Sequence, residues 1–207
     1  MLIAGFPRSG NTWLLYCAGM LTGCDKIGGD IAVANGVMKF QKIHVIGTHD
    51  EPTMFSLRNY RESATRHAQH SNSNDMSLIM KLIETEYMTI LRDFDSLKSP
   101  KMLVRYEDMM RSPKTIIQSI SAFLVPYGAT ELLCNMFLSK LAEHQQISLK
   151  NYGRTKSGDD VLYYSKSLGA NKCDLLDRCA MSTDEEMFEK YLQPYFIKGT
   201  SNAQNAV

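Results

Sequence analysis

The segment GFPRSGNTW, near the start of the chain, combines residue types that bind an anion. Gly5 and Gly10 allow the backbone to turn tightly, and the N–H groups that follow would point at an anion at the start of a helix. Ser9 and Thr12 add hydroxyl donors, and Arg8 adds a positive charge. The alternative is a plain strand-to-helix turn, but three convergent polar side chains favour an anion-binding loop.

The nature of the anion is indicated by a residue that the loop lacks. A phosphate-binding P-loop has the pattern G-x-x-x-x-G-K-[ST], in which the lysine reaches the phosphates. Here Asn11 takes the lysine position, and Arg8 is the only cation of the segment. Phosphoryl transfer relies on that lysine and on Mg²⁺, whereas a sulfuryl group carries less charge and can be transferred without a metal. The loop therefore favours sulfate over phosphate, and we expect no metal.

The same segment resembles the 5′-phosphosulfate loop of the sulfotransferases that use 3′-phosphoadenosine 5′-phosphosulfate (PAPS), usually written P-K-S-G-T-T-W. Four residues match outright: Ser9, Gly10, Thr12 and Trp13. Arg8 stands where the family has lysine, and Asn11 where it has the first threonine. The resemblance implies that residues 8–13 bind PAPS, that Arg8 also stabilises the group being transferred, and that Trp13 lies near the adenine.

A second segment, LRNYRESATR, resembles the 3′-phosphate motif of that family, R-N-P-R-D-x-x-x-S. Three residues match: Arg58, Asn59 and Arg61. Glu62 replaces the aspartate, and Arg66 stands at the serine position. The resemblance implies that Arg58 binds the 3′-phosphate, and Arg66 would do so by charge. From the sequence alone, a solvated face with three arginines is an equal alternative.

Two later segments extend the resemblance. VRYEDMMRSPKTIIQSISAFL is close to the family's R-Y-E-D-L strand end and the helix that follows, and Tyr106 corresponds to the tyrosine that approaches the adenine. The last family motif, R-K-G-x-x-G-D-W-K, is poorly kept in YSKSLGANK, where Lys166 would contact the 3′-phosphate. A rival placement is GRTKSGDD, residues 153–160, but the former lies nearer the final expected helix.

The base is expected at His49. GTHD, residues 47–50, resembles the K-T-H that carries the catalytic base in the same family. A histidine can take a proton from an acceptor hydroxyl at neutral pH, although a lone histidine is more often a packed or surface residue. His49 follows an apolar segment that we expect to be a strand. His44 would then point to the other face, because the two positions differ by an odd number.

These residues need a scaffold of alternating strands and helices. Short apolar runs predict strands at residues 2–6, 43–46, 53–57 and 101–104. Apolar stretches and capping residues predict helices at residues 12–21, 75–94, 114–124 and 182–196. The alternation predicts an α/β fold with three α/β/α layers and a central parallel sheet. The resemblance implies the P-loop, nucleotide-kinase-like sulfotransferase fold.

The remaining regions of the chain have weaker patterns. Residues 142–180 have little periodicity and are expected to form loop or short helix. We expect a single sulfotransferase-like domain over residues 1–198 and a flexible tail over residues 199–207. Acceptor contacts are expected in residues 25–42 and 142–165.

Composition narrows the class of protein. The chain has 207 residues and a formal net charge of +1, which gives no electrostatic footprint for nucleic acid or a membrane surface. No apolar run approaches the roughly 20 residues that span a membrane. Five scattered cysteines without a C-x-x-C pair are not a disulfide framework. We therefore expect a cytoplasmic protein.

Together these patterns predict a PAPS-dependent sulfotransferase. The acceptor would be a hydroxyl or amine on a small molecule or carbohydrate. One alternative is a kinase-like phosphotransferase that uses ATP and Mg²⁺, which Asn11 at the lysine position disfavours. Another is a degenerate nucleotide-binding protein without turnover, which the eroded last motif would fit.

Overall fold

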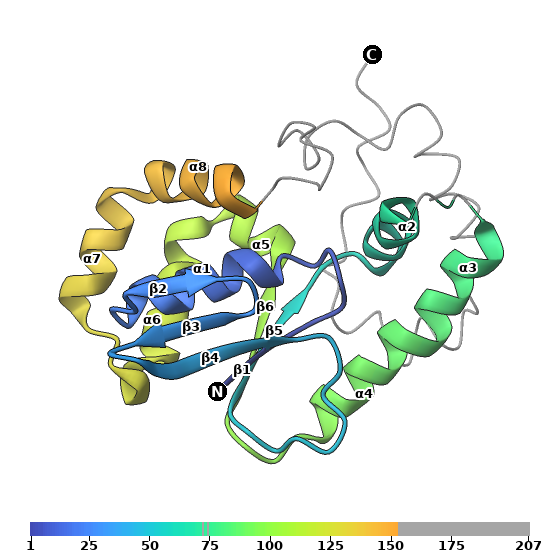
Figure 1. Ribbon diagram of the computed structural model, residues 1–207, viewed down its shortest axis with the longest axis horizontal. Helices are drawn as coiled ribbons and strands as arrows, with labels where there is room; N and C mark the ends of the chain where they lie inside the picture. Colours follow the sequence, from blue (N-terminus) through green and yellow to red (C-terminus); the bar gives the residue numbers. More distant parts are fainter. Residues whose placement is uncertain (72, 74, 153–207) are drawn as a thin grey trace.

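The structure is a computed structural model, and it describes residues 1–71, 73 and 75–152 of the chain. In this part of the chain, six strands form one sheet in the order β2-β3-β4-β1-β5-β6 (Figure 1). The strands are β1 (Leu2–Ala4), β2 (Lys26–Gly28), β3 (Ile31–Ala34), β4 (Val37–Ile43), β5 (Thr53–Leu57) and β6 (Lys101–Arg105). The α/β class expected from the sequence is confirmed.

The sheet is mixed rather than parallel throughout. Strands β4, β1, β5 and β6 run parallel, as expected. Strands β3 and β2 extend the sheet beyond β4, and each pairs with its neighbour in the antiparallel direction. The prediction of a parallel sheet missed them because glycine and charged residues interrupt the short apolar runs of residues 25–42. They form hairpins instead, and Asn35 and Gly36 make one turn with φ of 52° and 77°.

Helices connect the strands and cover the sheet. They are α1 (Asn11–Leu21), α2 (Tyr60–His70), α3 (Met76–Lys81), α4 (Met88–Ser96), α5 (Tyr106–Arg111), α6 (Pro113–Phe123), α7 (Glu131–Ser139) and α8 (Leu141–Tyr152). A π-helical segment, η1 (Leu82–Tyr87), joins α3 to α4, and a short 3₁₀ turn, η2 (Val125–Tyr127), follows α6. The predicted helix 75–94 is confirmed. Residues 142–152 are helical in α8, which agrees with the prediction of loop or short helix for residues 142–180, and the rest of that range lies outside the described residues.

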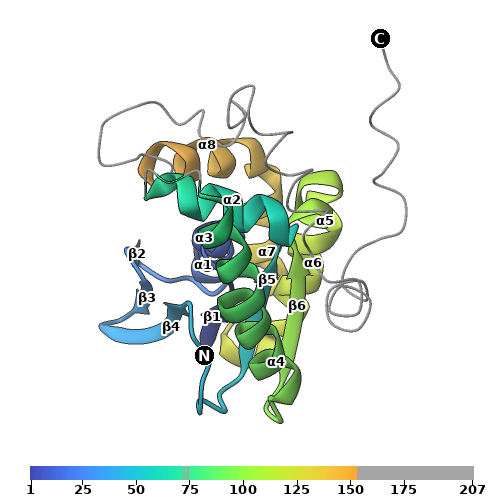
Figure 2. The ribbon, with the colours of Figure 1, turned by 90° about the vertical axis from the view of Figure 1, so that its right-hand side faces the viewer.

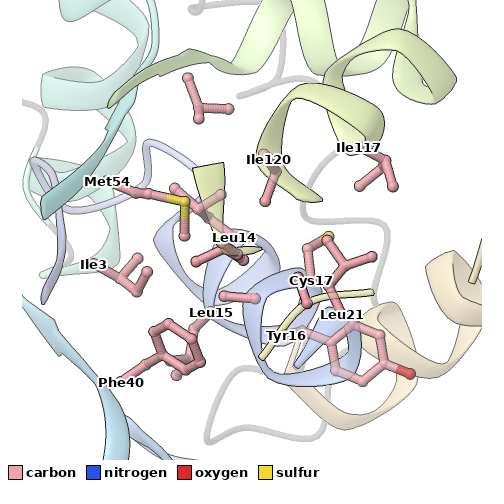
Figure 3. Close-up of a cluster of buried hydrophobic side chains, with 14 of the residues drawn as sticks. Ile3, Leu14, Leu15, Tyr16, Cys17, Leu21, Phe40, Met54, Ile117 and Ile120 are labelled. Atoms are coloured by element: carbon pink, nitrogen blue, oxygen red, sulfur yellow. The ribbon is translucent and has the colours of Figure 1, made fainter. Parts of the chain in front are cut away.

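Alternate residues of the strands feed two separate hydrophobic cores. Ile3 and Met54 face a core with α1, α6 and α7, whereas Ala4 and Phe55 face a core with α2, α3, η1 and α4. Figure 3 shows the first core, in which Ile3, Phe40 and Met54 meet the side chains of α1 and α6. Figures 1 and 2 show the two groups of helices on opposite sides of β1, β5 and β6. Helices therefore cover both faces of the sheet.

The carboxyl ends of the four parallel strands lie side by side along one edge of the sheet, across the ends of the strands rather than along an outer strand. The residues that follow their carboxyl ends are Gly5 after β1, His44 after β4, Arg58 after β5 and Tyr106 after β6. In parallel α/β sheets this edge is where ligands bind. Sequence motifs that lie far apart in the chain therefore meet at this edge.

The strand predicted at residues 43–46 was wrong. Strand β4 ends at Ile43, and its mostly exposed residues are held by pairing with β1 and β3 rather than by a regular apolar pattern. The apolar character of 43–46 has another cause, because Ile46 is buried in the core beside α2 and α4. The helix predicted at 182–196 and the tail at 199–207 lie outside the described residues.

Candidate anion-binding site

The loop between β1 and α1 has a constrained backbone. Arg8 has φ 69°, a left-handed conformation that is uncommon outside glycine, and Gly10 has φ 98°. A Cβ on Gly10 would lie 2.9 Å from Cδ2 of Tyr106, so the residue is also sterically limited to glycine. Backbone strain of this kind occurs mainly at functional sites, where the surrounding structure holds it in place.

The loop presents several hydrogen-bond donors at the start of α1. The first N–H groups of a helix have no acceptor within the helix. No other acceptor in the described part of the chain takes those of Asn11, Thr12 and Trp13, and the first turn holds no acidic residue. The Ser9 hydroxyl is fully buried and also has no partner among these residues. A buried donor without a partner is costly, and a bound anion would accept from this group.

Two buried arginines lie beside the loop. Arg58 Nη1 donates to the Arg8 carbonyl oxygen at 3.4 Å, and its Cζ lies 4.2 Å from the centre of the Tyr106 ring. Its Nη2 donates to Glu62 Oε1 at 2.8 Å, and Arg66 donates to the same oxygen through Nε at 2.9 Å and Nη2 at 2.8 Å. Both arginine residues are buried, with exposed fractions of 4% for Arg58 and 3% for Arg66. The structure thus brings Arg58 and Tyr106 to the loop, and links Arg66 to them through Glu62.

A tyrosine from the π-helical segment contacts the backbone of Arg58 and the ring of Phe6. Tyr87 is the last residue of η1, and its hydroxyl donates to the Arg58 carbonyl oxygen. Its ring packs on Phe6 with centroids 4.9 Å apart. Such π-helical segments are rare and frequently occur at functional sites.

His44, rather than His49, lies at the loop. His44 Nδ1 is 2.8 Å from the Gly5 carbonyl oxygen and 3.3 Å from Asn11 Nδ2. His49 lies near the opposite edge of the sheet, where its Nδ1 is 3.8 Å from Glu51 Oε1. The adjacent Asp50 accepts from the backbone N–H of Ser99, just before β6 begins.

The expected position of His49 was wrong because of where β4 ends. Because β4 ends at Ile43, the alternation of faces expected from a strand does not extend to His49. The intervening segment instead runs back to the start of β5. The structure therefore does not bring His49 to the loop.

A lysine also reaches the start of α1 from the neighbouring strand. Lys42, in β4, has its Nζ 3.4 Å from Thr12 Oγ1 and 2.7 Å from Asp30 Oδ1. Sequence analysis missed Lys42, and it considered His44 but chose His49 as the base. Their spacing held a signal, because the K-T-H motif has a lysine two residues before the histidine, and Lys42 and His44 keep that spacing.

His67, on α2, is a further residue that sequence analysis missed. Its ring meets the edge of Phe6 at 5.6 Å, and its Nδ1 is buried without a partner in the described part of the chain. Burial lowers the pKa of His67; the negative charge of Glu86 opposes this, and the positive charge of Arg8 adds to it. His67 is therefore electrostatically coupled to the loop.

Trp13 is partly buried and packs against neighbouring aromatic side chains. Its ring stacks on Tyr16, with centroids 5.5 Å apart, and Tyr16 shares a hydrogen bond of 2.9 Å with His144 Nδ1. His144 in turn stacks on Phe137 at 4.3 Å. Trp13 thus belongs to an aromatic cluster that joins α1, α7 and α8. Lys166 and the rival segment 153–160 lie outside the described residues.

No family model matches the chain, and the search of curated proteins finds no match. Within residues 1–71, 73 and 75–152, no helix is both long and apolar enough to cross a membrane. Over the same residues, no group of three or more His, Cys, Asp or Glu side chains is placed to hold a metal ion.

Proposed function

We propose that the protein is a sulfotransferase that moves the sulfuryl group of PAPS to a hydroxyl or amine of an acceptor. The observation that carries this proposal is that hydrogen-bond donors without a partner in the described part of the chain lie close to a histidine, at the carboxyl ends of the parallel strands. The donors are the first N–H groups of α1 and the Ser9 hydroxyl. The histidine is His44, at the Gly5 carbonyl.

The loop supplies the chemistry that binds the donor. Backbone N–H groups and the Ser9 hydroxyl would donate hydrogen bonds to the oxygens of the 5′-phosphosulfate, and Arg8 would add positive charge. Arg58, whose Nε is buried without a partner in the described part of the chain, would donate to the 3′-phosphate. Tyr106 stands beside Gly10 and Arg58, which supports a role near the adenine.

His44 replaces His49 as the proposed base. A carbonyl oxygen 2.8 Å from Nδ1 requires a proton between the two atoms, since two lone pairs would repel at that distance. Neutral His44 therefore carries its proton on Nδ1, and Nε2 holds a lone pair. Nε2 would take the proton of the acceptor O–H or N–H.

The transfer step then balances as a single displacement. The acceptor oxygen or nitrogen forms a bond to sulfur, and the bond from sulfur to the bridging oxygen breaks. The leaving group is 3′,5′-bisphosphoadenosine. Lys42 and the N–H groups at the start of α1 would stabilise the negative charge that builds on the bridging oxygen.

One observation favours a second function. The ammonium group of Lys42 lies at the start of α1, so the site has a lysine cation from β4 although Asn11 occupies the P-loop lysine position. A phosphotransferase that uses ATP and Mg²⁺ would use such a cation in the same place.

Calorimetric binding separates the two functions. We would titrate the protein with 3′,5′-bisphosphoadenosine and, in parallel, with ADP and Mg²⁺. Tighter binding of the bisphosphate is expected, and transfer of label from ³⁵S-PAPS to a panel of phenols, sugars and amines would follow. Preference for ADP and Mg²⁺ would support the phosphotransferase, and absence of binding by either ligand would contradict both functions.

A further inference from the structure

Asn11 is buried at the loop, and its side-chain NH₂ group donates to backbone carbonyl oxygens. It is 5% exposed, and its Nδ2 donates to the carbonyl oxygens of Gly5 at 2.8 Å and Phe6 at 3.3 Å. The side chain that occupies the P-loop lysine position therefore points back at the loop. Its effect on a ligand must pass through another residue.

That residue is His44. The Gly5 carbonyl oxygen accepts from Asn11 Nδ2 and from His44 Nδ1, both at 2.8 Å. A carbonyl oxygen has two lone pairs and can accept from both donors. The contact of 3.3 Å between Asn11 Nδ2 and His44 Nδ1 is then the spacing of two donors on one acceptor. Asn11 holds the carbonyl in the direction that His44 needs.

The packing around Gly5 supports this arrangement. A Cβ on Gly5 would lie 2.3 Å from Asn11 Oδ1 and 2.6 Å from the Ser56 carbonyl oxygen. Gly5 and Asn11 therefore fit together, with no room for a side chain at position 5. The carbonyl of Gly5 is fixed by its neighbours rather than by its own conformational preference.

We propose that Asn11 is a positioning residue for His44. By holding the Gly5 carbonyl at Nδ1, Asn11 keeps the neutral imidazole in the tautomer with its lone pair on Nε2. The consequence for turnover rests on the proposed sulfotransferase function, whereas the consequence for the tautomer does not. A tautomer with the proton on Nε2 has no base on the outward side.

The tautomer is measured directly by NMR. Two-bond ¹H–¹⁵N correlation spectra of protein labelled at histidine distinguish a protonated ring nitrogen from an unprotonated one, and a His44→Gln variant assigns the His44 signals. We expect His44 to be protonated on Nδ1 in the wild type. Asn11→Leu, similar in shape but without donors, and Asn11→Ala should shift it toward Nε2 protonation.

A matched control separates this effect from a general change in the protein. Asn135→Ala removes an exposed asparagine of α7 and should leave the His44 spectrum unchanged. Wild-type His44 protonated on Nε2 would overturn the proposal, and this holds even if neither Asn11 variant folds. A folded Asn11 variant with the wild-type tautomer would also overturn it.

Kinetics give the second measurement. In Asn11→Ala, kcat should fall about tenfold or more, as expected for a residue that orients another. The affinity for 3′,5′-bisphosphoadenosine should stay within about twofold, since the backbone N–H groups remain. Loss of affinity with unchanged kcat would overturn the proposal. If wild-type protein shows the expected tautomer but transfers nothing, the sulfotransferase function fails while the positioning of His44 stands.

Discussion

Lys42 and Thr12 lie in contact although 30 positions separate them in the chain, with Nζ of Lys42 3.4 Å from Thr12 Oγ1. The parallel register of β1 and β4 explains this, because Lys42 lies opposite Ile3, close to where β1 gives way to the loop. A strand next to the loop thus supplies the lysine that the loop sequence lacks. Asp30 holds the same ammonium at 2.7 Å, which limits where it can point.

This contact predicts a large effect of Lys42 on turnover. Lys42→Met keeps the apolar stem and removes the charge, so kcat should fall about 10²-fold if the ammonium stabilises the leaving oxygen. Lys39→Met, at an exposed position of the same strand, is the matched control and should leave kcat unchanged. Equal rates for Lys42→Met and the wild type would remove Lys42 from the mechanism.

His44 and His49 give a paired test of the base. His44→Gln should abolish measurable transfer while bisphosphate binding remains, because the base acts on the acceptor. His49→Gln should transfer at the wild-type rate, since His49 lies at the other edge beside Glu51. Initial rates of transfer from ³⁵S-PAPS measure both effects. Loss of transfer in His49→Gln with a wild-type rate in His44→Gln would restore His49 as the base.

The contrast between these histidines shows what the sequence could and could not predict. Strands β5 and β6 and the helix from Met76 to Ser96 follow apolar patterns that local sequence carries. Strand β4 has no such pattern, since exposed residues of both kinds are mixed in it and pairing on both sides holds it in the sheet. The end of β4 decides which histidine reaches the loop. That end is set by tertiary pairing and not by local propensity.

The anion-binding loop was predictable for a different reason. Glycine at positions 5 and 10 is required by close contacts and, at Gly10, by positive φ, and such requirements leave a direct trace in sequence. Lys42 and His67 leave no such steric trace, since each reaches the loop from another element. Long-range contacts of this kind need the strand order, which the sequence alone did not give.

Arg58 should dominate binding of the bisphosphate. Arg58→Met removes a buried guanidinium group whose Nε has no partner in the described part of the chain. Hydrogen bonds to charged groups are worth about 1.5–3 kcal/mol, so the dissociation constant should rise about 10- to 100-fold. Calorimetry with 3′,5′-bisphosphoadenosine measures it. Arg61→Met, on the same helix, is the control, and equal losses in both variants would argue against a specific role for Arg58.

The buried His144 should make stability depend on pH. Burial lowers the pKa of His144 from its ordinary value of 6.5, the charge of Glu143 opposes this, and that of Lys140 adds to it. The unfolded chain then takes up the proton first. The contribution to stability is therefore present above pH 6.5 and is lost as the pH falls through the lowered pKa of the folded state.

Urea unfolding at about pH 7.5 and pH 5 tests this dependence. The free energy of unfolding should decrease between the two values, and the decrease should be smaller in His144→Gln, which removes the titrating group. His67 also has a lowered pKa, so part of the dependence should remain in that variant. An unchanged decrease in His144→Gln would show that His144 does not contribute.

Two glycines with positive φ separate backbone strain from steric contact in the loop. Gly10 has φ 98° and Gly36 has φ 77°, so an alanine at either position is strained by about 1–3 kcal/mol. Only at Gly10 would the new Cβ meet a neighbour, Tyr106, at 2.9 Å, whereas nothing lies within 4 Å at Gly36.

Gly10→Ala should therefore lower the free energy of unfolding more than Gly36→Ala, as measured in urea. It should also weaken bisphosphate binding, because relief of the contact would move Tyr106 away from Arg58. Equal destabilisation with intact binding would mean that Tyr106 yields without disturbing the site.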